Sequence, residues 1–131
     1  MSIESNKQIA LAYFSALTRC DIQTMGDYMT DDATWWVSSG TKFSGLHDKK
    51  SFLGRIPGLF ADTTGQIDLE FFEITAEDNR VNLIAKGHLQ FNDGRVYSSN
   101  YSFLLMFHDG KIASGKEFLD AAHVNEIFGE P

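Results

Sequence analysis

The spacing of apolar residues changes once along this 131-residue chain, and that change restricts the fold more than any other feature. From Ser5 to about Thr18, apolar side chains recur every three or four residues, which predicts an amphipathic helix with Ser5 as its N-cap. From Gln66 onward they recur every second residue, which is the period of β-strands. Helices followed by a run of strands indicate an α+β fold, in which the helices pack on one face of a curved, mainly antiparallel sheet.

Two shorter segments are expected directly after the first helix. Asp21 is a residue type that caps helices, and it predicts a second helix whose apolar positions continue to Met29. Residues 34–37 combine a threonine, two tryptophans and a valine, which is the composition of a short strand. The polar, glycine-containing residues 38–45 are expected to form a loop.

A third helix is expected around residues 52–60, where apolar residues again follow the helical period. Pro57 lies inside this stretch, and proline lacks the N–H group that an inner helical position donates. The third helix should therefore end or kink near Arg55.

Four strands are predicted in the second half of the chain, each joined to the next by a polar turn. Asp109-Gly110 is typical of a two-residue hairpin, and the other connections are also rich in Asp, Asn and Gly. A short helix is expected to begin near Ala121. Residues 1–131 are interpreted as one domain. The predicted strands are 66–75, 80–92, 95–108 and 111–119.

Composition argues against several classes of partner. The formal net charge is −7 and no cluster of basic residues is present, so nucleic acid is not an expected partner. No run of 18 apolar residues occurs and residues 1–8 are polar, so we expect a soluble, cytoplasmic protein without a membrane partner. The four histidines lack metal-ligand spacing and no glycine-rich phosphate loop follows a strand, so neither a metal nor a cofactor is expected.

Two groups of residues carry a resemblance to a known family. Asp31-Asp32-Ala33-Thr34-Trp35 follows the second helix, and Asp109-Gly110-Lys111-Ile112 is followed by Glu117-Phe118-Leu119-Asp120. In this order and separation they resemble the nuclear transport factor 2-like superfamily, and within it the SnoaL-like branch of relatives of polyketide cyclases and ketosteroid isomerases. The resemblance implies a cone-shaped α+β barrel that encloses a mostly apolar pocket, often in a homodimer formed through the outer face of the sheet.

Two polar residues on different strands are the candidate catalytic pair. His88 lies on the more polar face of the strand 80–92, and Asp120 shares a face with Lys116 and Phe118 at the end of the last strand. The resemblance implies that both strands form one cavity wall, where a carboxylate beside an imidazole would prepare it for proton transfer. The alternatives are a solvated His88 and an Asp120 that caps the last helix.

Further residues are expected to bind a substrate. An apolar helix face carries Tyr13, whose phenol could stabilise an oxyanion by analogy with steroid isomerases, or could be an ordinary core residue. The adjacent Trp35 and Trp36 should point to opposite faces of their strand, so that only one enters the cavity. The predicted substrate-binding residues are Tyr13, Trp35, Lys86, Tyr101 and Phe118.

The resemblance implies chemistry without a cofactor on a small apolar carbonyl compound, by cyclisation, isomerisation or dehydration. Val37 and Phe103 stand where a steroid isomerase would have acidic residues, which disfavours that enzyme's usual mechanism. The alternative is a non-catalytic module of the same fold that binds a small ligand or dimerises.

Overall fold

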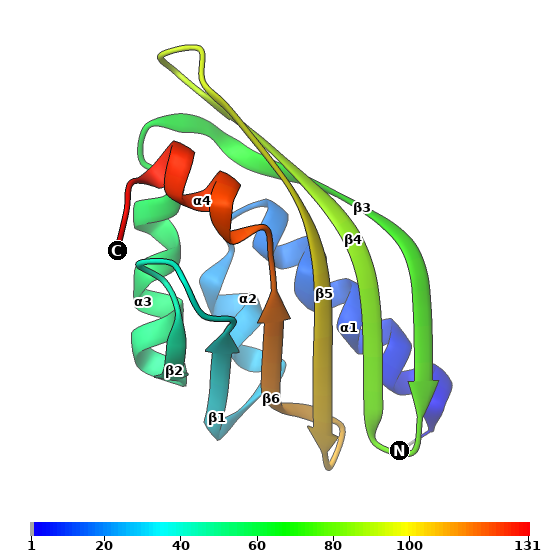
Figure 1. Cartoon of the computed structure of the whole chain (residues 1–131). Coiled ribbons are helices and arrows are strands. Elements are labelled where there is room, and N and C mark those ends of the chain that lie inside the picture. Colours follow the sequence, from blue (N-terminus) through cyan, green and yellow to red (C-terminus); the bar gives the residue numbers. More distant parts are fainter. Residues whose placement is uncertain (1) are drawn as a thin grey trace.

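Residues 2–131 are described by the structure, a computed structural model, and over this range they form four helices and six strands (Figure 1). The helices are α1 (Ile3–Thr18), α2 (Ile22–Asp27), α3 (Lys49–Leu59) and α4 (Ala121–Phe128). The strands are β1 (Met29–Val37), β2 (Gly45–Asp48), β3 (Thr63–Glu77), β4 (Arg80–Phe91), β5 (Val96–His108) and β6 (Lys111–Phe118).

Side-chain caps set where the first two helices begin. Ser2 caps α1, because its Oγ accepts a hydrogen bond of 3.0 Å from the Ser5 backbone N–H, so the cap lies three residues before its predicted position at Ser5. Asp21 caps α2 as predicted, with its Oδ1 3.2 Å from the Thr24 nitrogen. The second helix ends at Asp27, because Met29 already belongs to β1.

The segment between β1 and β3 differs from the sequence prediction in two ways. Residues 45–48 form β2, which pairs antiparallel with β1; this strand was not predicted, and only Gly45 lay in the predicted loop 38–45. Helix α3 is capped by Asp48 and continues to Leu59, so the predicted end or kink near Arg55 is wrong. Pro57 is tolerated because it lies in the last turn, where its missing N–H removes one hydrogen bond and only two helical residues follow.

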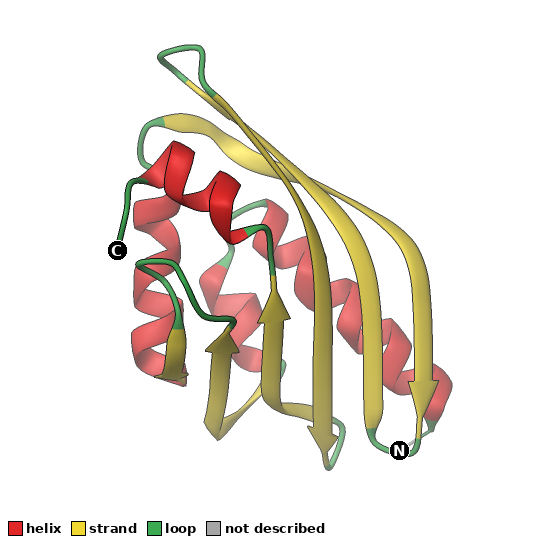
Figure 2. Ribbon diagram, viewed as in Figure 1, coloured by secondary structure: helices red, strands yellow, loops and turns green. Residues whose placement is uncertain are grey.

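The six strands form one sheet in the order β2-β1-β6-β5-β4-β3 (Figure 2). Strands β3 to β6 are the predicted antiparallel meander, and each begins and ends within a few residues of the expected positions. Strand β1 pairs in parallel with β6, which brings residues 34–37 beside residues 114–117. The β5–β6 turn is made by Asp109 and Gly110, both at positive φ, as the sequence predicted for a two-residue hairpin.

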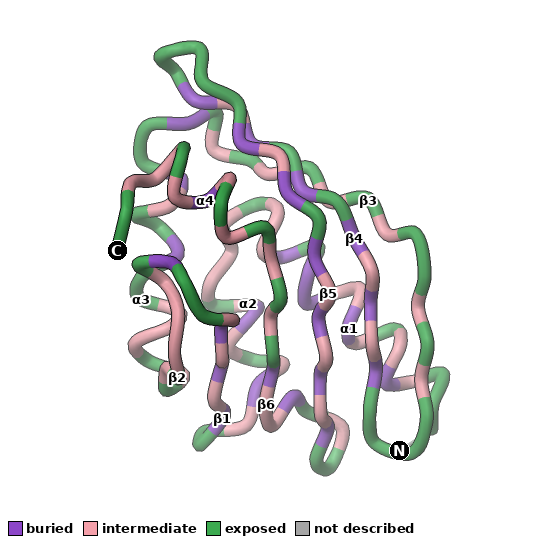
Figure 3. Tube along the Cα trace, in the orientation of Figure 1, coloured by how far each residue is buried: buried purple, intermediate pink, exposed green. Residues whose placement is uncertain are grey.

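The sheet is curved and unclosed, with α1, α2 and α3 behind it as drawn and α4 across one end (Figures 1 and 2). Alternate residues of β4 and β5 are buried beneath these helices, whereas their neighbours face outward (Figure 3). The buried face carries most of the aromatic core, in which Phe14 of α1 lies 4.5 Å from Phe103 between ring centroids. The fold is therefore the predicted α+β arrangement, with a concave, apolar inner face.

Strand β6 approaches the core very closely at Gly115. A Cβ atom at this position would overlap the indole ring of Trp35, which lies opposite it on the neighbouring strand. Glycine is thus required there to seat the tryptophan. In the part of the chain that the structure describes, no helix combines the length and the apolar character needed to cross a bilayer.

Candidate functional site

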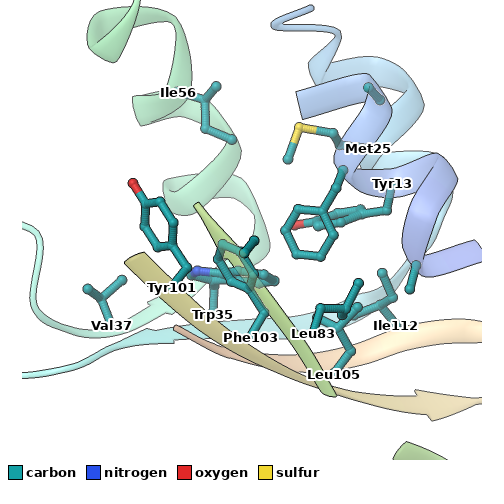
Figure 4. Packing of buried hydrophobic residues seen from close by; sticks show 14 of the residues in the cluster. Tyr13, Met25, Trp35, Val37, Ile56, Leu83, Tyr101, Phe103, Leu105 and Ile112 are labelled. Carbon is teal, nitrogen blue, oxygen red and sulfur yellow. The ribbon is translucent and has the colours of Figure 1, made fainter. Parts of the chain in front are cut away.

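A largely apolar pocket lies between the inner face of the sheet and the helices. Its volume is about 130 Å³, and its walls come from α1, α3, α4 and all six strands. In the close view of the core, Trp35, Tyr101 and Phe103 extend from the sheet towards Tyr13 of α1 and Ile56 of α3 (Figure 4). A pocket with this lining and few polar groups is the usual form of a small-molecule site.

Glu117 contributes a carboxylate to this pocket. It lies near the end of β6, opposite Phe103 on β5, and faces inward beside Leu119. The indole Nε1 of Trp35 donates a hydrogen bond of 2.9 Å to its Oε1. The parallel pairing of β1 and β6, which places Val37 beside Glu117, brings the tryptophan within reach of the carboxylate.

The environment of Glu117 favours its protonated form. Burial raises the pKa of Glu117 from 4.5 to about 7, and the hydrogen bond from Trp35 only partly offsets this effect. The residue is half-buried, and it lines the pocket. A carboxyl group with this pKa can both accept and release a proton near neutral pH.

Tyr13 presents a second polar group to the same pocket. Its side chain is fully buried, and among residues 2–131 no hydrogen-bond partner lies within reach of its hydroxyl. Burial raises the pKa of Tyr13 well above its ordinary value of 10, and the charge of Glu117 adds to the increase. The phenol is therefore a neutral donor that is free to bind an oxygen atom in the pocket.

Tyr97 and Tyr101 form a hydrogen-bonded pair on β5. Their hydroxyl oxygens are 2.6 Å apart, and both residues line the pocket. Burial is the main cause that raises the pKa of Tyr97 to about 12, and it also raises the pKa of Tyr101 well above its ordinary value. Because both stay protonated, each can donate one hydrogen bond, and the pair retains one donor beyond the bond that joins its members.

The structure does not bring His88 and Asp120 together in the pocket, so the predicted placement of this pair is wrong. His88 and Lys86 are exposed on the outer face of β4, opposite Asp68 and Glu70 of β3. Lys86 lies opposite Glu70, and such a pair of opposite charges across neighbouring strands is favourable on a solvent-facing side of a sheet. Their side chains point to the solvent side of the sheet. A solvated His88 was the alternative that the sequence allowed.

Asp120 has a structural position at the start of α4. Its Oδ1 accepts a hydrogen bond of 3.2 Å from the His123 backbone N–H, and the residue is exposed. This is the capping alternative that the sequence also allowed. Phe118 likewise lies outside the pocket, with 48% of its surface exposed on the outer face.

The remaining predicted residues do line the pocket: Tyr13, Trp35 and Tyr101. Trp35 is buried, whereas Trp36 contacts Phe118 on the opposite face with ring centroids 5.3 Å apart, so the prediction of opposite orientations is confirmed. Binding of a substrate by the three lining residues stays a prediction. No group of three potential metal ligands occurs within residues 2–131.

Two histidines have more contacts than their sequence positions suggested. His47 lines the pocket, and its Nε2 lies 2.7 Å from the carbonyl oxygen of Phe43. His123 stacks on the ring of Tyr97, with centroids 5.5 Å apart, and its Nε2 accepts a hydrogen bond from the Ser98 backbone N–H. His123 thus packs against Tyr97, one member of the tyrosine pair.

Glu117 is the functional candidate that sequence reasoning missed. The period of the last strand is visible in the sequence, but the face with Lys116, Phe118 and Asp120 was expected in the pocket. Glu117 lies on the other face of that strand. The sequence does contain a signal for Glu117. It shares one face of its strand with Gly115 and Leu119, and a charged residue is unusual on such an apolar face. The pairing of β6 with β1 and β5 decides which set faces inward.

Comparison with known proteins identifies the family. The family model of the SnoaL-like domain matches residues 10–115, so this chain belongs to the SnoaL-like family. A search of curated protein sequences found no match.

Solved structures share the fold over nearly the full chain. A nuclear transport factor 2-like protein from Burkholderia xenovorans LB400 has a TM-score of 0.76 at 18% identity, covering 96% of this chain and 97% of its own. A protein with a ketosteroid isomerase-like fold from Catenulispora acidiphila DSM 44928, in complex with trimethylamine, has a TM-score of 0.76 at 14% identity, covering 94% and 93%. TerC, co-crystallised with polyporic acid, has a TM-score of 0.81 at 16% identity, covering 94% and 97%. These similarities establish the fold.

Proposed function

We propose that this protein catalyses proton transfer on a small apolar carbonyl compound, without a cofactor, and that Glu117 is the acid and base. The observation that carries the proposal is a carboxyl group with a pKa of about 7 that lines an apolar pocket. An enzyme that must both remove and return a proton needs a group that is readily ionised and readily protonated at its working pH. Isomerisation, cyclisation and dehydration all include such a step.

The reaction begins when the Glu117 carboxylate removes a proton from the carbon next to the substrate's carbonyl group. The electron pair of the broken C–H bond moves to the carbonyl oxygen and forms an enolate. The free hydroxyl of Tyr13 donates a hydrogen bond to that oxygen, in a site where few other groups compete. The Glu117 carboxylic acid then returns the proton to the same carbon or to another one along the conjugated system.

Trp35 and Tyr101 complete the site in this proposal. The indole N–H of Trp35 orients Oε1 of Glu117, which leaves the other carboxylate oxygen for the substrate. The hydroxyl of Tyr101, joined to that of Tyr97, is a second donor for an oxygen atom of the substrate. The aromatic rings around them exclude water and hold the apolar part of the substrate.

The isomerisation of cyclohex-3-en-1-one to cyclohex-2-en-1-one tests this proposal, because it moves one proton and changes the ultraviolet absorbance. We expect the rate to rise with pH through about 7, as Glu117 becomes ionised. Glu117→Gln should lower the rate about 10²- to 10⁴-fold. Glu70→Gln, the same substitution on the exposed outer face, is the matched control.

The same measurement separates the enzyme from the alternative, a module that only binds a ligand. If the wild-type protein accelerates the reaction no more than Glu117→Gln does, the proposed chemistry is wrong and the binding module is the better description. Tyr13→Phe should lower the rate by about 10²-fold or more while leaving the pH dependence in place, because the tyrosine contacts the oxygen and not the transferred proton.

We also infer a homodimer in the cytoplasm, formed through the outer face of the sheet. Phe118 and Trp36 form an exposed aromatic contact on this face, and Phe72 of β3 is 56% exposed. Exposed aromatic groups of this kind are enriched where proteins associate. The outer-face dimer implied by the resemblance would cover them.

A further inference from the structure

A second hollow lies beside the pocket, between α3, the segment before β2 and the end of α4. Four residues line both spaces: Phe43, Arg55, Leu59 and Phe128. The two spaces are therefore neighbours that share these side chains. We call the hollow the mouth of the proposed active site.

Two cationic side chains line this mouth in a protein whose formal net charge is −7. Arg55 of α3 lines both the pocket and the hollow. Lys42, in the segment before β2, lines the hollow, and its Nζ lies close to Gly129. Among the ion pairs formed by residues 2–131, none includes either cation. Both charges are therefore available to a ligand.

The surface of α3 leaves room for a group beside these cations. Gly54 and Gly58 lie one helical turn apart, and a Cβ atom at either position would have no other atom within 4 Å. Glycine inside a helix costs about 0.5 to 1 kcal/mol relative to alanine. The two glycines keep the mouth open next to Arg55 despite that cost.

The size of the pocket limits the rest of the ligand. A cavity of about 150 Å³ with apolar walls accommodates benzene, and the pocket here has a volume of about 130 Å³. One six-membered ring fills such a space, whereas a fused system of three or four rings does not. The polar groups Glu117, Tyr13 and Tyr101 line the same space as that ring.

We propose that the natural ligand is a single-ring carbonyl compound with a carboxylate group, in which the ring occupies the pocket and the carboxylate binds Arg55 and Lys42. This inference rests on the proposed function for the carbonyl group, which lies beside Tyr13 and Glu117. The carboxylate is recognised by charge, because Arg55, which lines both the pocket and the hollow, and Lys42, which lines the hollow, form no ion pair with the described residues.

Binding of two probes tests this inference: 4-hydroxybenzoate and its neutral methyl ester. Both have one ring and a phenolic oxygen that resembles an enol, and they differ in the charge at the far end. Titration calorimetry at pH 6, where Glu117 is mainly protonated, should give about tenfold tighter binding of the carboxylate. Added salt should reduce this preference, because the mouth is open to solvent.

A pair of charge-matched variants locates the preference. Arg55→Gln with Lys42→Gln should give equal affinities for the two probes, with the affinity for the ester unchanged. Arg80→Gln with Lys111→Gln removes the same two charges from exposed positions at the first residues of β4 and β6, which line neither space, and it should retain the wild-type preference. Equal binding of the probes by the wild-type protein, binding of neither probe, or a preference that survives in the first variant overturns the inference.

The variant Glu117→Gln distinguishes this inference from the proposed function. It should keep the preference for the carboxylate, because Glu117 does not line the mouth. A protein that prefers the carboxylate but isomerises no enone would retain the anion site and lose the proposed chemistry. A protein that isomerises the enone with equal affinity for both probes would show the reverse.

Discussion

The carboxyl group of Glu117 is the residue-scale feature with the clearest physical consequence. Ionisation in the pocket replaces hydration by contact with aromatic and aliphatic groups, and one hydrogen bond from Trp35 does not compensate for this loss. The Glu117 carboxyl group therefore has two opposing requirements. It must stay buried to contact an apolar substrate, and it must ionise to remove a proton.

Because ionisation of buried Glu117 is unfavourable, the free energy of unfolding should depend on pH. The pKa of Glu117 is about 7 in the folded protein and near 4.5 in the unfolded chain, so between these values the folded state holds the extra proton. Its contribution to the free energy of unfolding is then greatest below pH 4.5 and falls by up to about 3 kcal/mol as the pH rises to 7. Urea unfolding at pH 5 and pH 8 measures the change.

The variant Glu117→Gln supplies the comparison, because its side chain cannot ionise. We expect the wild-type protein to lose stability relative to this variant between pH 5 and pH 8. Parallel pH profiles for the two proteins would contradict the raised pKa. Tyr13, Tyr97 and Tyr101 of the pocket have raised pKa values and do not titrate in this range. His47 also lines the pocket, but it is present in both proteins and cancels in the comparison.

Gly115 makes a second residue-scale prediction, which concerns packing. The variant Gly115→Ala should lower the free energy of unfolding by about 1 to 3 kcal/mol, because the methyl group would overlap the Trp35 ring. It should also reduce proton-transfer activity, since displacement of Trp35 disturbs its hydrogen bond to Glu117. Gly54→Ala is the control for the stability measurement alone, because its added methyl group meets open space in α3 and should not lower stability. Equal stability of Gly115→Ala and the wild type would contradict this account of the packing.

At the scale of elements, α4 depends on a cap that the sequence could also assign to catalysis. Asp120→Ala should lower the free energy of unfolding by about 1 kcal/mol, because the His123 N–H loses its acceptor. Asp120→Asn keeps an acceptor and should have nearly wild-type stability and enone isomerisation. A large loss of activity in Asp120→Asn, without a loss of stability, would show that this residue acts in the reaction.

The pairing of β1 with β6 is the element-scale feature that assembles the site. It places Trp35 beside Gly115 and Val37 beside Glu117, although about 80 residues separate these positions in the chain. The strand period of β6 was visible in the sequence, but two faces of equal length were possible. Only the contact with β1 and the helices determines that Glu117 points inward and Phe118 outward.

At the scale of the whole molecule, the proposed dimer makes a prediction about mass. Sedimentation should give twice the chain mass of 14.7 kDa at micromolar concentration. Phe118→Glu places a charge in the exposed aromatic contact with Trp36 and should shift the protein towards the monomer. Ile3→Glu alters an exposed apolar residue of α1, away from the outer face, and should leave the mass unchanged. A wild-type monomer would overturn the dimer.

The sequence by itself determined the order of the elements and their approximate limits. Hydrophobic period, helix caps and turn residues act over a few positions, so Asp21, Asp109 and Gly110 could be interpreted without knowledge of the rest of the chain. The same local reasoning separated Trp35 from Trp36, whereas the family resemblance led to Tyr13 and Tyr101 as candidates for the pocket.

Tertiary structure alone decided which polar residues meet the pocket. His88 and Asp120 are residue types that can act as an acid and a base. Strand pairing places His88 on the outer face of the sheet, and Asp120 caps helix α4. Glu117 acquires its raised pKa from burial among residues of α1, β1 and β5, which no local pattern contains. Desolvation depends on everything that surrounds a group in space, and for that reason the chemistry of this site could be located only after the chain had been folded.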